Sequence, residues 1–273
     1  MVRKPAVSVS GRGVSERGAR NLRRWLPEEV PVAFVFDGGT LAVMMASPHD
    51  IEDLAHGFAL SEGVVASLDE IENFEIAAHE RGVEARFWLT PARREALAAR
   101  RRHMAGPVGC GLCGVDSLEE AMRPLPVVAD PAWRISAAEA AAGPERLRAR
   151  QPLHDRTHAV HAAGFLRPEE GVVLAREDVG RHNALDKLIG AMARAGDDPA
   201  HGAFVMTSRV SVELVQKCAF AGCPCLIAAS APTAQALRLA EAAGITVAGF
   251  ARGGLLEVFS RPDRISFEIS DVA

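Results

Sequence analysis

Residues 203–229 read AFVMTSRVSVELVQKCAFAGCPCLIAA, and this stretch decides the fold. Two apolar runs, at 203–206 and 225–229, enclose a segment in which Val212, Val215 and Ala219 recur at helical spacing. Continuous apolar runs of this length are typical of strands that are buried on both faces of a sheet. The stretch therefore predicts a strand, a helix and a second strand parallel to the first.

The same kind of pattern extends to both sides of this unit. Its order predicts an α/β domain over residues 151–273, in which a mixed sheet carries helices on both faces. The expected elements are strands at 159–166 and 171–176, a helix from about Arg181, a helix through Ala236 and Leu237, and strands at 246–249, 255–259 and 265–269.

The first third of the chain predicts a smaller N-terminal α+β subdomain over residues 29–104. The turn residues Asp37-Gly38-Gly39 separate two apolar runs between residues 30 and 45, which is a strong hairpin signal. An apolar helix is expected from Ile51. Two more strands lie between residues 74 and 89, and Thr90-Pro91 begins a basic helix.

Two flanking segments lack this regularity. Residues 1–24 hold seven basic side chains against the single acid Glu16, so residues 1–28 are predicted to be a flexible basic arm in solvent. Residues 105–150 are predicted to be a mobile glycine-rich loop and a helical connection. In that connection Ser136 is expected to cap a helix and Gly143-Pro144 to interrupt it.

The overall charge favours neither a nucleic acid nor a membrane surface as partner. The 273 residues include 31 basic and 35 acidic side chains, which gives a formal net charge of −4. No apolar run resembles a signal peptide or is long enough to span a bilayer. Five cysteines provide no even disulfide framework, so a reducing, cytoplasmic location is expected.

The carboxyl ends of the predicted strands indicate a ligand site, because ligands of open α/β sheets bind beyond these ends. Free N–H groups at helix starts and the forked arginine side chain both favour phosphate. A single end is better explained by ordinary helix caps and solvated arginines, whereas all four together predict an anionic, phosphate-bearing ligand. The residues at these ends are Arg181, His182, Thr207, Ser208, Arg209, Ser230, Phe250, Ala251, Arg252, Gly253 and Gly254.

Other roles are open for the groups near the first of these ends. Glu177 and Asp178, beside Arg181 and His182, are compatible with an internal ion-pair network rather than a catalytic set. Neither His182 nor His161 has the spacing of a metal ligand to a partner, so no metal site is predicted.

Cys110 and Cys113 form a Cys-x-x-Cys motif that is flanked by glycines. A zinc half-site would need two more soft ligands, and the remaining cysteines are Cys218, Cys223 and Cys225. A thioredoxin-like motif would follow a strand, whereas this one follows a basic helix. A buried structural role for these two cysteines is disfavoured, because buried cysteines usually have apolar neighbours rather than glycines. An exposed thiolate that carries sulfur on a mobile loop fits best, while Cys218 and Cys225 lie in apolar segments and are predicted to be core residues.

Several of these stretches closely resemble the FdhD family of formate dehydrogenase accessory proteins. The most specific is residues 176–187, Arg-Glu-Asp-Val-Gly-Arg-His-Asn-Ala-Leu-Asp-Lys, and the second is residues 109–114, Gly-Cys-Gly-Leu-Cys-Gly. Residues 54–58, 61–63, 207–209, 230–233 and 248–252 also match, so the resemblance covers nearly everything after residue 30.

The resemblance implies a cytidine-deaminase-like fold, a homodimer and a sulfurtransferase role. Members of the family take persulfide sulfur from a cysteine desulfurase. They pass it to the molybdenum (or tungsten) bis-guanine-dinucleotide cofactor of formate dehydrogenase, for which GDP is an analogue ligand. Carried over to this chain, Cys110 is the persulfide cysteine and Cys113 a second relay or resolving thiol. Residues 250–255, Phe250 to Leu255, correspond to the cofactor-binding stretch.

The sequence departs from the family at one place and leaves two other functions open. Thr157-His158-Ala159 stands where the family usually has Thr-Gly-Gly, which puts the local backbone in question. A non-catalytic carrier that shields the cofactor would not need the cysteine pair. A thiol–disulfide oxidoreductase would need a reversible Cys110–Cys113 disulfide and no nucleotide site.

Overall fold

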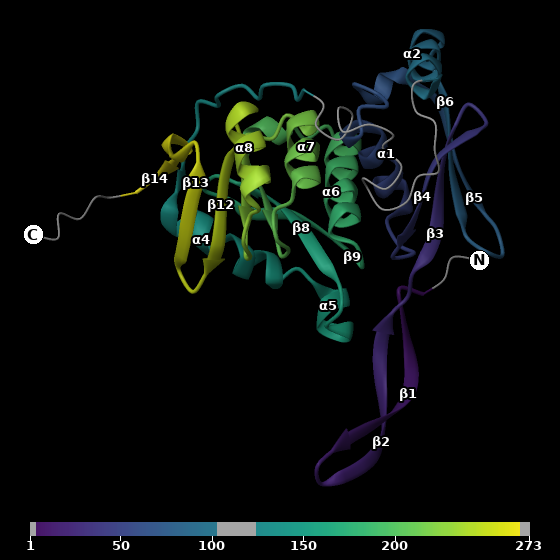
Figure 1. Ribbon diagram of the computed structural model, residues 1–273, viewed down its shortest axis with the longest axis vertical. Helices are drawn as coiled ribbons and strands as arrows, with labels where there is room; N and C mark the ends of the chain where they lie inside the picture. Colours follow the sequence, from purple (N-terminus) through teal and green to yellow (C-terminus); the bar gives the residue numbers. More distant parts are fainter. Residues whose placement is uncertain (1–3, 103–123, 268–273) are drawn as a thin grey trace, which may run out of the picture.

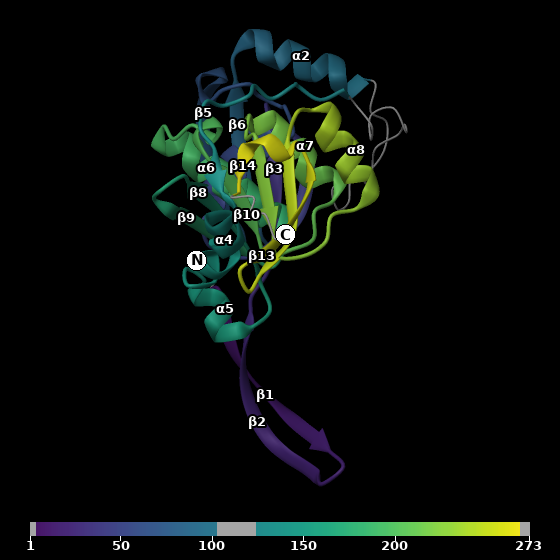
Figure 2. The ribbon, with the colours of Figure 1, turned by 90° about the vertical axis from the view of Figure 1, so that its left-hand side faces the viewer.

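The computed structural model describes residues 4–102 and 124–267. Figure 1 shows a large sheet with helices, a smaller sheet beside it, and a two-stranded ribbon that extends away from both. The long axis of the ribbon leads away from the body in both views (Figures 1 and 2).

The large sheet has the strand order β13-β12-β11-β10-β8-β9. The strands β10, β11 and β12 are parallel, and β8 and β13 run antiparallel to them. Side chains alternate between the faces: Phe204 and Met206 pack against α6, α7 and α8, whereas Val205 packs on the side of α4. The predicted mixed sheet with helices on both faces is confirmed. Its elements are β8 (His161–Arg167), β9 (Gly171–Asp178), α6 (Arg181–Ala195), β10 (Ala203–Met206), α7 (Val212–Ala221), β11 (Cys225–Ala228), α8 (Ala234–Ala242), β12 (Thr246–Arg252) and β13 (Leu255–Ser260).

The smaller sheet has the order β4-β3-β6-β5 and packs one face against α1. Phe34 stacks on Phe58 of α1 with ring centroids 4.0 Å apart, and Phe36 stacks on Phe87 at 4.7 Å. The expected hairpin around Asp37-Gly38 is present. The elements are β3 (Val30–Phe36), β4 (Gly39–Ala46), α1 (Ile51–Ser61), β5 (Ile71–Ala78), β6 (Val83–Leu89) and α2 (Pro91–Arg102).

The predicted interruption at Gly143-Pro144 is wrong, because α4 continues through it. Ser136 does cap this helix, and its side chain accepts a hydrogen bond from the Glu139 N–H at 3.1 Å. A proline removes one helical hydrogen bond, but Gly143 and Leu147 bury the helix against the sheet and offset that loss. The elements of this region are β7 (Ile135–Ser136), α4 (Ala137–Arg148) and α5 (Pro152–Thr157), and β7 pairs with β14 (Ile265–Ser266).

The expectation of an arm without regular structure is also wrong, because the N-terminal segment forms the ribbon of β1 (Ala6–Ser15) and β2 (Gly18–Pro27). Alternating Val and Ser residues suit a strand, and Gly18 takes the positive φ of +117° that its turn requires. At its base the Arg156 guanidinium stacks over the Trp25 ring at 3.6 Å. The ribbon is nevertheless largely exposed, as the basic composition suggested.

Candidate functional site

Four segments that the sequence placed at strand ends meet at one edge of the large sheet. Because β8 is antiparallel to both β9 and β10, the strand β9 runs in the same direction as β10, β11 and β12. The carboxyl ends of these four strands therefore share an edge. We call the residues at these ends the strand-end row; they are residues 179–183, 207–211, 229–233 and 250–254.

Hydrogen bonds join the neighbouring segments of the strand-end row. The Thr207 hydroxyl accepts from the Ala162 N–H at 2.9 Å, where β8 begins. The Val210 N–H donates to the Ala231 carbonyl at 3.1 Å. The Phe250 N–H in turn donates to the Ser230 carbonyl at 3.3 Å. Main-chain hydrogen bonds thus join the segments 207–211, 229–233 and 250–254, with Arg209 exposed among them and the Ser208 side chain buried.

One end of the row is formed by Arg181 and His182, in the first turn of α6. The N-cap residue of this helix is Gly180, which offers no side chain to cap it. Arg181 Nε and His182 Nε2 are buried, and neither has a hydrogen-bond partner among the residues that the structure describes. Buried polar groups normally have partners. The nearest carboxylate oxygen to His182, on Glu213, is 4.0 Å away and beyond hydrogen-bond range.

His182 is held in its neutral form. Burial lowers the pKa of His182 to about 4, and the positive charges of Arg181 and Lys217 act in the same direction. Glu213 opposes this shift only in part. A neutral imidazole beside a guanidinium can donate and accept hydrogen bonds, which suits an anionic ligand that carries further polar groups.

The other end of the row is the turn between β12 and β13. Phe250 has a positive φ of 52°, and Gly253 and Gly254 have φ values of 58° and 78°. Arg252 and Leu255 are exposed, whereas Ala251 is buried, so only its main chain faces the edge. The Gly253 N–H already donates to Glu145 of α4 at 3.1 Å, which removes one predicted donor for phosphate.

The two ends lie far apart because β9 and β12 are separated by β8, β10 and β11 in the sheet. Four interstrand spacings of about 4.8 Å place them roughly 19 Å from each other. An extended ligand with charged groups along its length matches this separation better than a single phosphate does.

Glu177 and Asp178 do not belong to the ligand-facing surface. Glu177 accepts hydrogen bonds from the Leu153 and His154 N–H groups, both at 2.8 Å. Asp178 is fully buried and lies 2.7 Å from the Lys187 ammonium. The predicted internal network is therefore the correct alternative for these two acids.

Sequence reasoning missed the contact between α1 and α6, which lie side by side in Figure 1. A Cβ atom on Gly57 would stand 1.7 Å from the Asp186 carbonyl oxygen, and one on Gly190 would stand 1.9 Å from the Asp53 carbonyl oxygen. Only glycine permits so close an approach. The signal was present as glycines inside two helical patterns, one of them within the stretch 54–58 that matches the family.

The α1–α6 contact also holds buried charges that the sequence did not reveal. Asp186 accepts from the Ser61 hydroxyl at 2.6 Å and from the Lys217 ammonium at 3.0 Å. Asp53 of α1 pairs with Arg176 at 2.8 Å and with Arg194. Most of the motif 176–187 thus joins the two sheets, and within it Arg181 and His182 keep buried polar atoms without a described partner.

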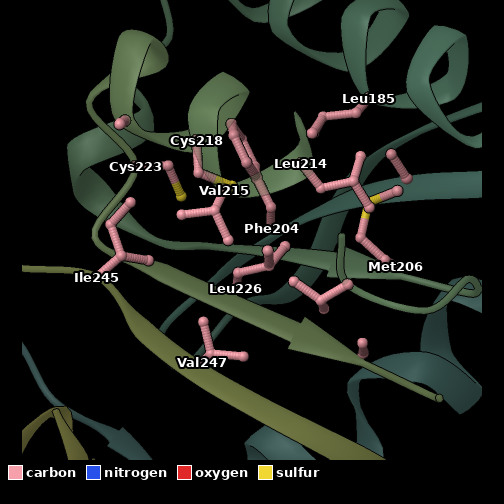
Figure 3. Close-up of a cluster of buried hydrophobic side chains, with 14 of the residues drawn as sticks. Leu185, Phe204, Met206, Leu214, Val215, Cys218, Cys223, Leu226, Ile245 and Val247 are labelled. Carbon is pink, nitrogen blue, oxygen red and sulfur yellow. The ribbon is translucent and has the colours of Figure 1, made fainter. Parts of the chain in front are cut away.

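The predicted catalytic cysteines Cys110 and Cys113 lie outside the described residues. The other three cysteines are free and fully buried, and Figure 3 shows Cys218 and Cys223 among the apolar side chains of the core. Burial raises the pKa of Cys223 to about 12 and raises that of Cys218 and Cys225 as well. The prediction that Cys218 and Cys225 are core residues is confirmed. In the described part of the chain, no group of three His, Cys, Asp or Glu side chains is placed to hold a metal ion.

The departure at Thr157-His158-Ala159 has a structural account. His158 ends α5 with φ 55° and ψ 26°, which is the left-handed conformation. Glycine adopts this conformation freely and other residues do so at a cost. The backbone required at this position is therefore one that a glycine would favour, and here His158 adopts it.

Comparison with known proteins shows the family of the chain. Residues 27–266 match the model of the FdhD/NarQ family. A relative from Agrobacterium fabrum, named sulfur carrier protein FdhD, is 50% identical over 242 residues, which are 89% of each chain. A relative of the same name from Cupriavidus necator is 48% identical over 244 residues, covering 89% of this chain and 84% of its own.

A solved structure has the same fold. It is described as a putative formate dehydrogenase accessory protein from Desulfotalea psychrophila, and it superposes with a TM-score of 0.77 at 23% identity over 96% of this chain and all of its own. Within residues 4–102 and 124–267, no helix has both the length and the apolar character needed to cross a membrane.

Proposed function

Because this chain belongs to the FdhD/NarQ family, we propose that it is a sulfurtransferase that delivers persulfide sulfur to a molybdenum or tungsten bis-guanine-dinucleotide cofactor. The observation that supports this most is the strand-end row, where Arg181 and His182 leave buried polar atoms without described partners at one end. The relatives' name, sulfur carrier, supports the sulfur chemistry.

The row suits the chemical nature of this acceptor. The cofactor carries two pyrophosphates and two guanines, so it is long and anionic. Arg181 supplies a guanidinium at one end of the row and Arg252 an exposed one at the other. The uncapped first turn of α6 adds main-chain N–H groups that favour phosphate. Binding a dinucleotide along the row would use both ends at once.

The sulfur chemistry is assigned to Cys110 and Cys113. For loading, the Cys110 thiolate attacks the outer sulfur of a persulfide on a cysteine desulfurase, and the desulfurase cysteine leaves as a thiolate. For release, the Cys113 thiolate attacks the inner sulfur of the Cys110 persulfide. A Cys110–Cys113 disulfide forms and the outer sulfur leaves as sulfide with the electron pair of the broken bond. A thiol reductant then restores both thiols.

The partners follow from this assignment. The sulfur donor is a cysteine desulfurase, the receiving system is formate dehydrogenase, and the working unit is a homodimer in the cytoplasm. These assignments are part of the proposal and rest on the family and on the sequence.

Intact mass measurement tests the sulfur step. The protein is incubated with a cysteine desulfurase and cysteine, and the wild type is expected to gain one sulfur atom that a thiol reductant removes. Cys110→Ala with Cys113→Ala should abolish the gain, while Cys218→Ala, which alters a buried core thiol, should leave it intact. No added sulfur in the wild type, or undiminished loading in the double variant, would overturn the sulfur assignment.

Calorimetry with GDP tests the strand-end row. Binding is expected, and Arg252→Ala should weaken it, whereas Arg238→Ala on the exposed side of α8 should not. Absence of GDP binding together with a reversible cysteine disulfide would favour the oxidoreductase alternative. Full activation of formate dehydrogenase by the double cysteine variant would favour the non-catalytic carrier.

A further inference from the structure

The ribbon of β1 and β2 has two different faces. Pairing places Val7 opposite Leu26 and Val9 opposite Arg24 on one face, and Ser8 opposite Trp25 on the other. The Trp25 face is the one that meets α5 at the base of the ribbon, through the Arg156 stack. We call the opposite side, with Val7, Val9, Leu22, Arg20, Arg24 and Leu26, the valine face.

The valine face carries exposed apolar side chains. Val7 is 38% exposed, Val9 42% and Leu26 41%. Further along the ribbon, Gly11 and Gly13 provide no side chains, and Leu22 lies over them, 3.0 Å from where a Cβ on Gly13 would be. A partner on this part of the face would therefore meet the Leu22 side chain, packed over two glycines that add no side chains of their own.

A ribbon of this kind is poorly stable without a cover. An isolated two-stranded hairpin is marginal in water, and long exposed strands with apolar side chains normally gain a third strand or a packed partner. The contact with α5 reaches only the base, yet both strands run regularly for ten residues. The ribbon that carries this face extends away from the body of its own chain (Figure 2).

Charge indicates what covers it. Residues 6–27 hold five arginines and one glutamate, which gives the ribbon a net charge of +4. Because the whole chain has a net charge of −4, the residues outside the ribbon together carry −8. Two such ribbons would repel each other, whereas a ribbon and the body of a second chain attract. Arg20 and Arg24 lie on the valine face itself and add the charged part of such a contact.

We propose that the ribbon is an arm that docks its valine face on the body of a second copy of this chain, and the reciprocal arm docks in the same way. Such an exchange is an isologous contact and closes a two-fold dimer. The inference deepens the homodimer of the proposed function and rests on it, but it is independent of the sulfur chemistry.

Sedimentation equilibrium over a range of concentrations tests the proposal. The wild type is expected to pass from the monomer mass of 29.0 kDa to twice that mass. Val9→Asp with Leu26→Asp should raise the dimer dissociation constant at least about tenfold, since two charges would enter an apolar contact. Val43→Asp is the matched control, because Val43 is an exposed valine (47%) on the strand β4 of the small sheet.

A second variant distinguishes a weakened dimer contact from unfolding of the ribbon itself. Arg20→Glu with Arg24→Glu keeps the apolar side chains, reverses the charge of the face and should also weaken the dimer, more strongly at low salt. In the wild type, amide exchange in β1 and β2 should slow as concentration rises, and it should not do so in either variant.

The outcomes separate the inference from the proposed function. The proposal that the ribbon docks on a second copy would be overturned by a wild type that is monomeric at every concentration. It would also be overturned if both double variants dimerise as tightly as the wild type. Binding of another protein to the ribbon of a monomeric chain would overturn it as well. Persulfide loading measured on the same variants reports on the sulfur assignment alone, and it should be unchanged in all of them.

Discussion

The motif 176–187 contributes to two regions that treat buried polar groups in opposite ways. Where α6 meets α1 and the segment before it, Asp178 and Asp186 are fully buried and each has an ammonium within 3.0 Å. At the strand-end row, three residues away in sequence, Arg181 and His182 keep buried atoms for which the described residues supply no partner. The first region therefore has its charge partners within the described residues, whereas the second does not.

This difference distinguishes paired from unpaired buried polar groups inside one stretch of twelve residues. A buried charge with its partner in place contributes to joining the two sheets, and removing that partner leaves it uncompensated. A buried polar group without a partner lowers the stability of the free protein, and a ligand can supply the missing hydrogen bond. Changes in the first region should therefore alter unfolding, and changes in the second should alter binding.

The largest expected effect is that of Lys217→Met. It leaves the buried Asp186 carboxylate with the Ser61 hydroxyl but without its cation, which typically costs about 3–5 kcal/mol of unfolding free energy. Urea denaturation measures it. Adding Asp186→Leu to the same chain should recover much of the loss, and the exposed control Arg238→Met should change stability by less than about 0.5 kcal/mol. A single-variant loss below about 1 kcal/mol would contradict a structural role for the pair.

The second largest loss of stability is expected for Gly57→Ala. The added methyl would stand 1.7 Å from the Asp186 carbonyl oxygen, so α1 and α6 must separate, at a cost of about 2–3 kcal/mol despite the better helix propensity of alanine. The denaturation midpoint measures it. Gly11→Ala makes the same chemical change where the new Cβ meets Leu22 at 3.4 Å, an ordinary contact, and should cost far less. Equal effects for the two variants would argue against the close helix contact.

At the strand-end row, the lowered pKa of His182 should make the stability of the protein depend on pH. The pKa of His182 is about 4 in the folded chain, below its ordinary value of 6.5, so the unfolded chain binds the proton more tightly. Stability is then complete above pH 6.5 and falls as the pH drops toward 4. Between pH 6.5 and 5 the wild type should lose about 1.5 kcal/mol more than His182→Gln. Parallel curves for the two proteins would mean that His182 titrates normally.

Arg181→Ala should separate the two regions most directly. Its unfolding free energy should stay within about 0.5 kcal/mol of the wild type, because the Arg181 Nε that is removed is buried without a hydrogen-bond partner among the described residues. GDP affinity should fall about tenfold, which is ~1.4 kcal/mol. Calorimetry and denaturation on the same preparation check both values. Unchanged affinity would place the ligand elsewhere, and a loss of stability like that of Lys217→Met would assign Arg181 to the structural region.

The smallest expected effect belongs to His158→Gly. The left-handed backbone of His158, with φ 55°, is free of strain for glycine, so the variant should gain about 0.5 kcal/mol. Thermal unfolding measures this gain, with His201→Gly at the exposed end of a short helical turn as the control. A destabilised His158→Gly would show that the imidazole contributes more through its contact with His154 than its backbone costs.

Much of the fold was predictable because its signals are local. The runs at 203–206 and 225–229 are apolar throughout, so they predicted buried strands, and the turn at Asp37-Gly38 predicted its hairpin. The arm at 1–28 was misjudged because composition masked an alternation of Val7 and Val9 with serines. Pro144 was misjudged because burial of a helix can offset the loss of one main-chain hydrogen bond.

The site was predictable in part, for a related reason. Residues at the ends of parallel strands must share an edge, so Arg181, Thr207 and Arg252 could be grouped from their places in the pattern. Whether a given side chain faces that edge or the interior depends on packing between segments far apart in sequence. Ala251 turned inward and the Gly253 N–H met Glu145, and nothing local to either residue signals this.

The sequence by itself determined the α/β class, the order of the strands along the chain, the edge where their ends meet and the family, because each depends on residue type and spacing. The tertiary structure alone decided which polar residues are paired. Asp186 meets Ser61 across 125 residues and Lys217 across 31. Pair distances of that kind arise only when α1, α6 and α7 pack together. That packing completes the α1–α6 contact and leaves Arg181 Nε and His182 Nε2 buried without a partner among the described residues.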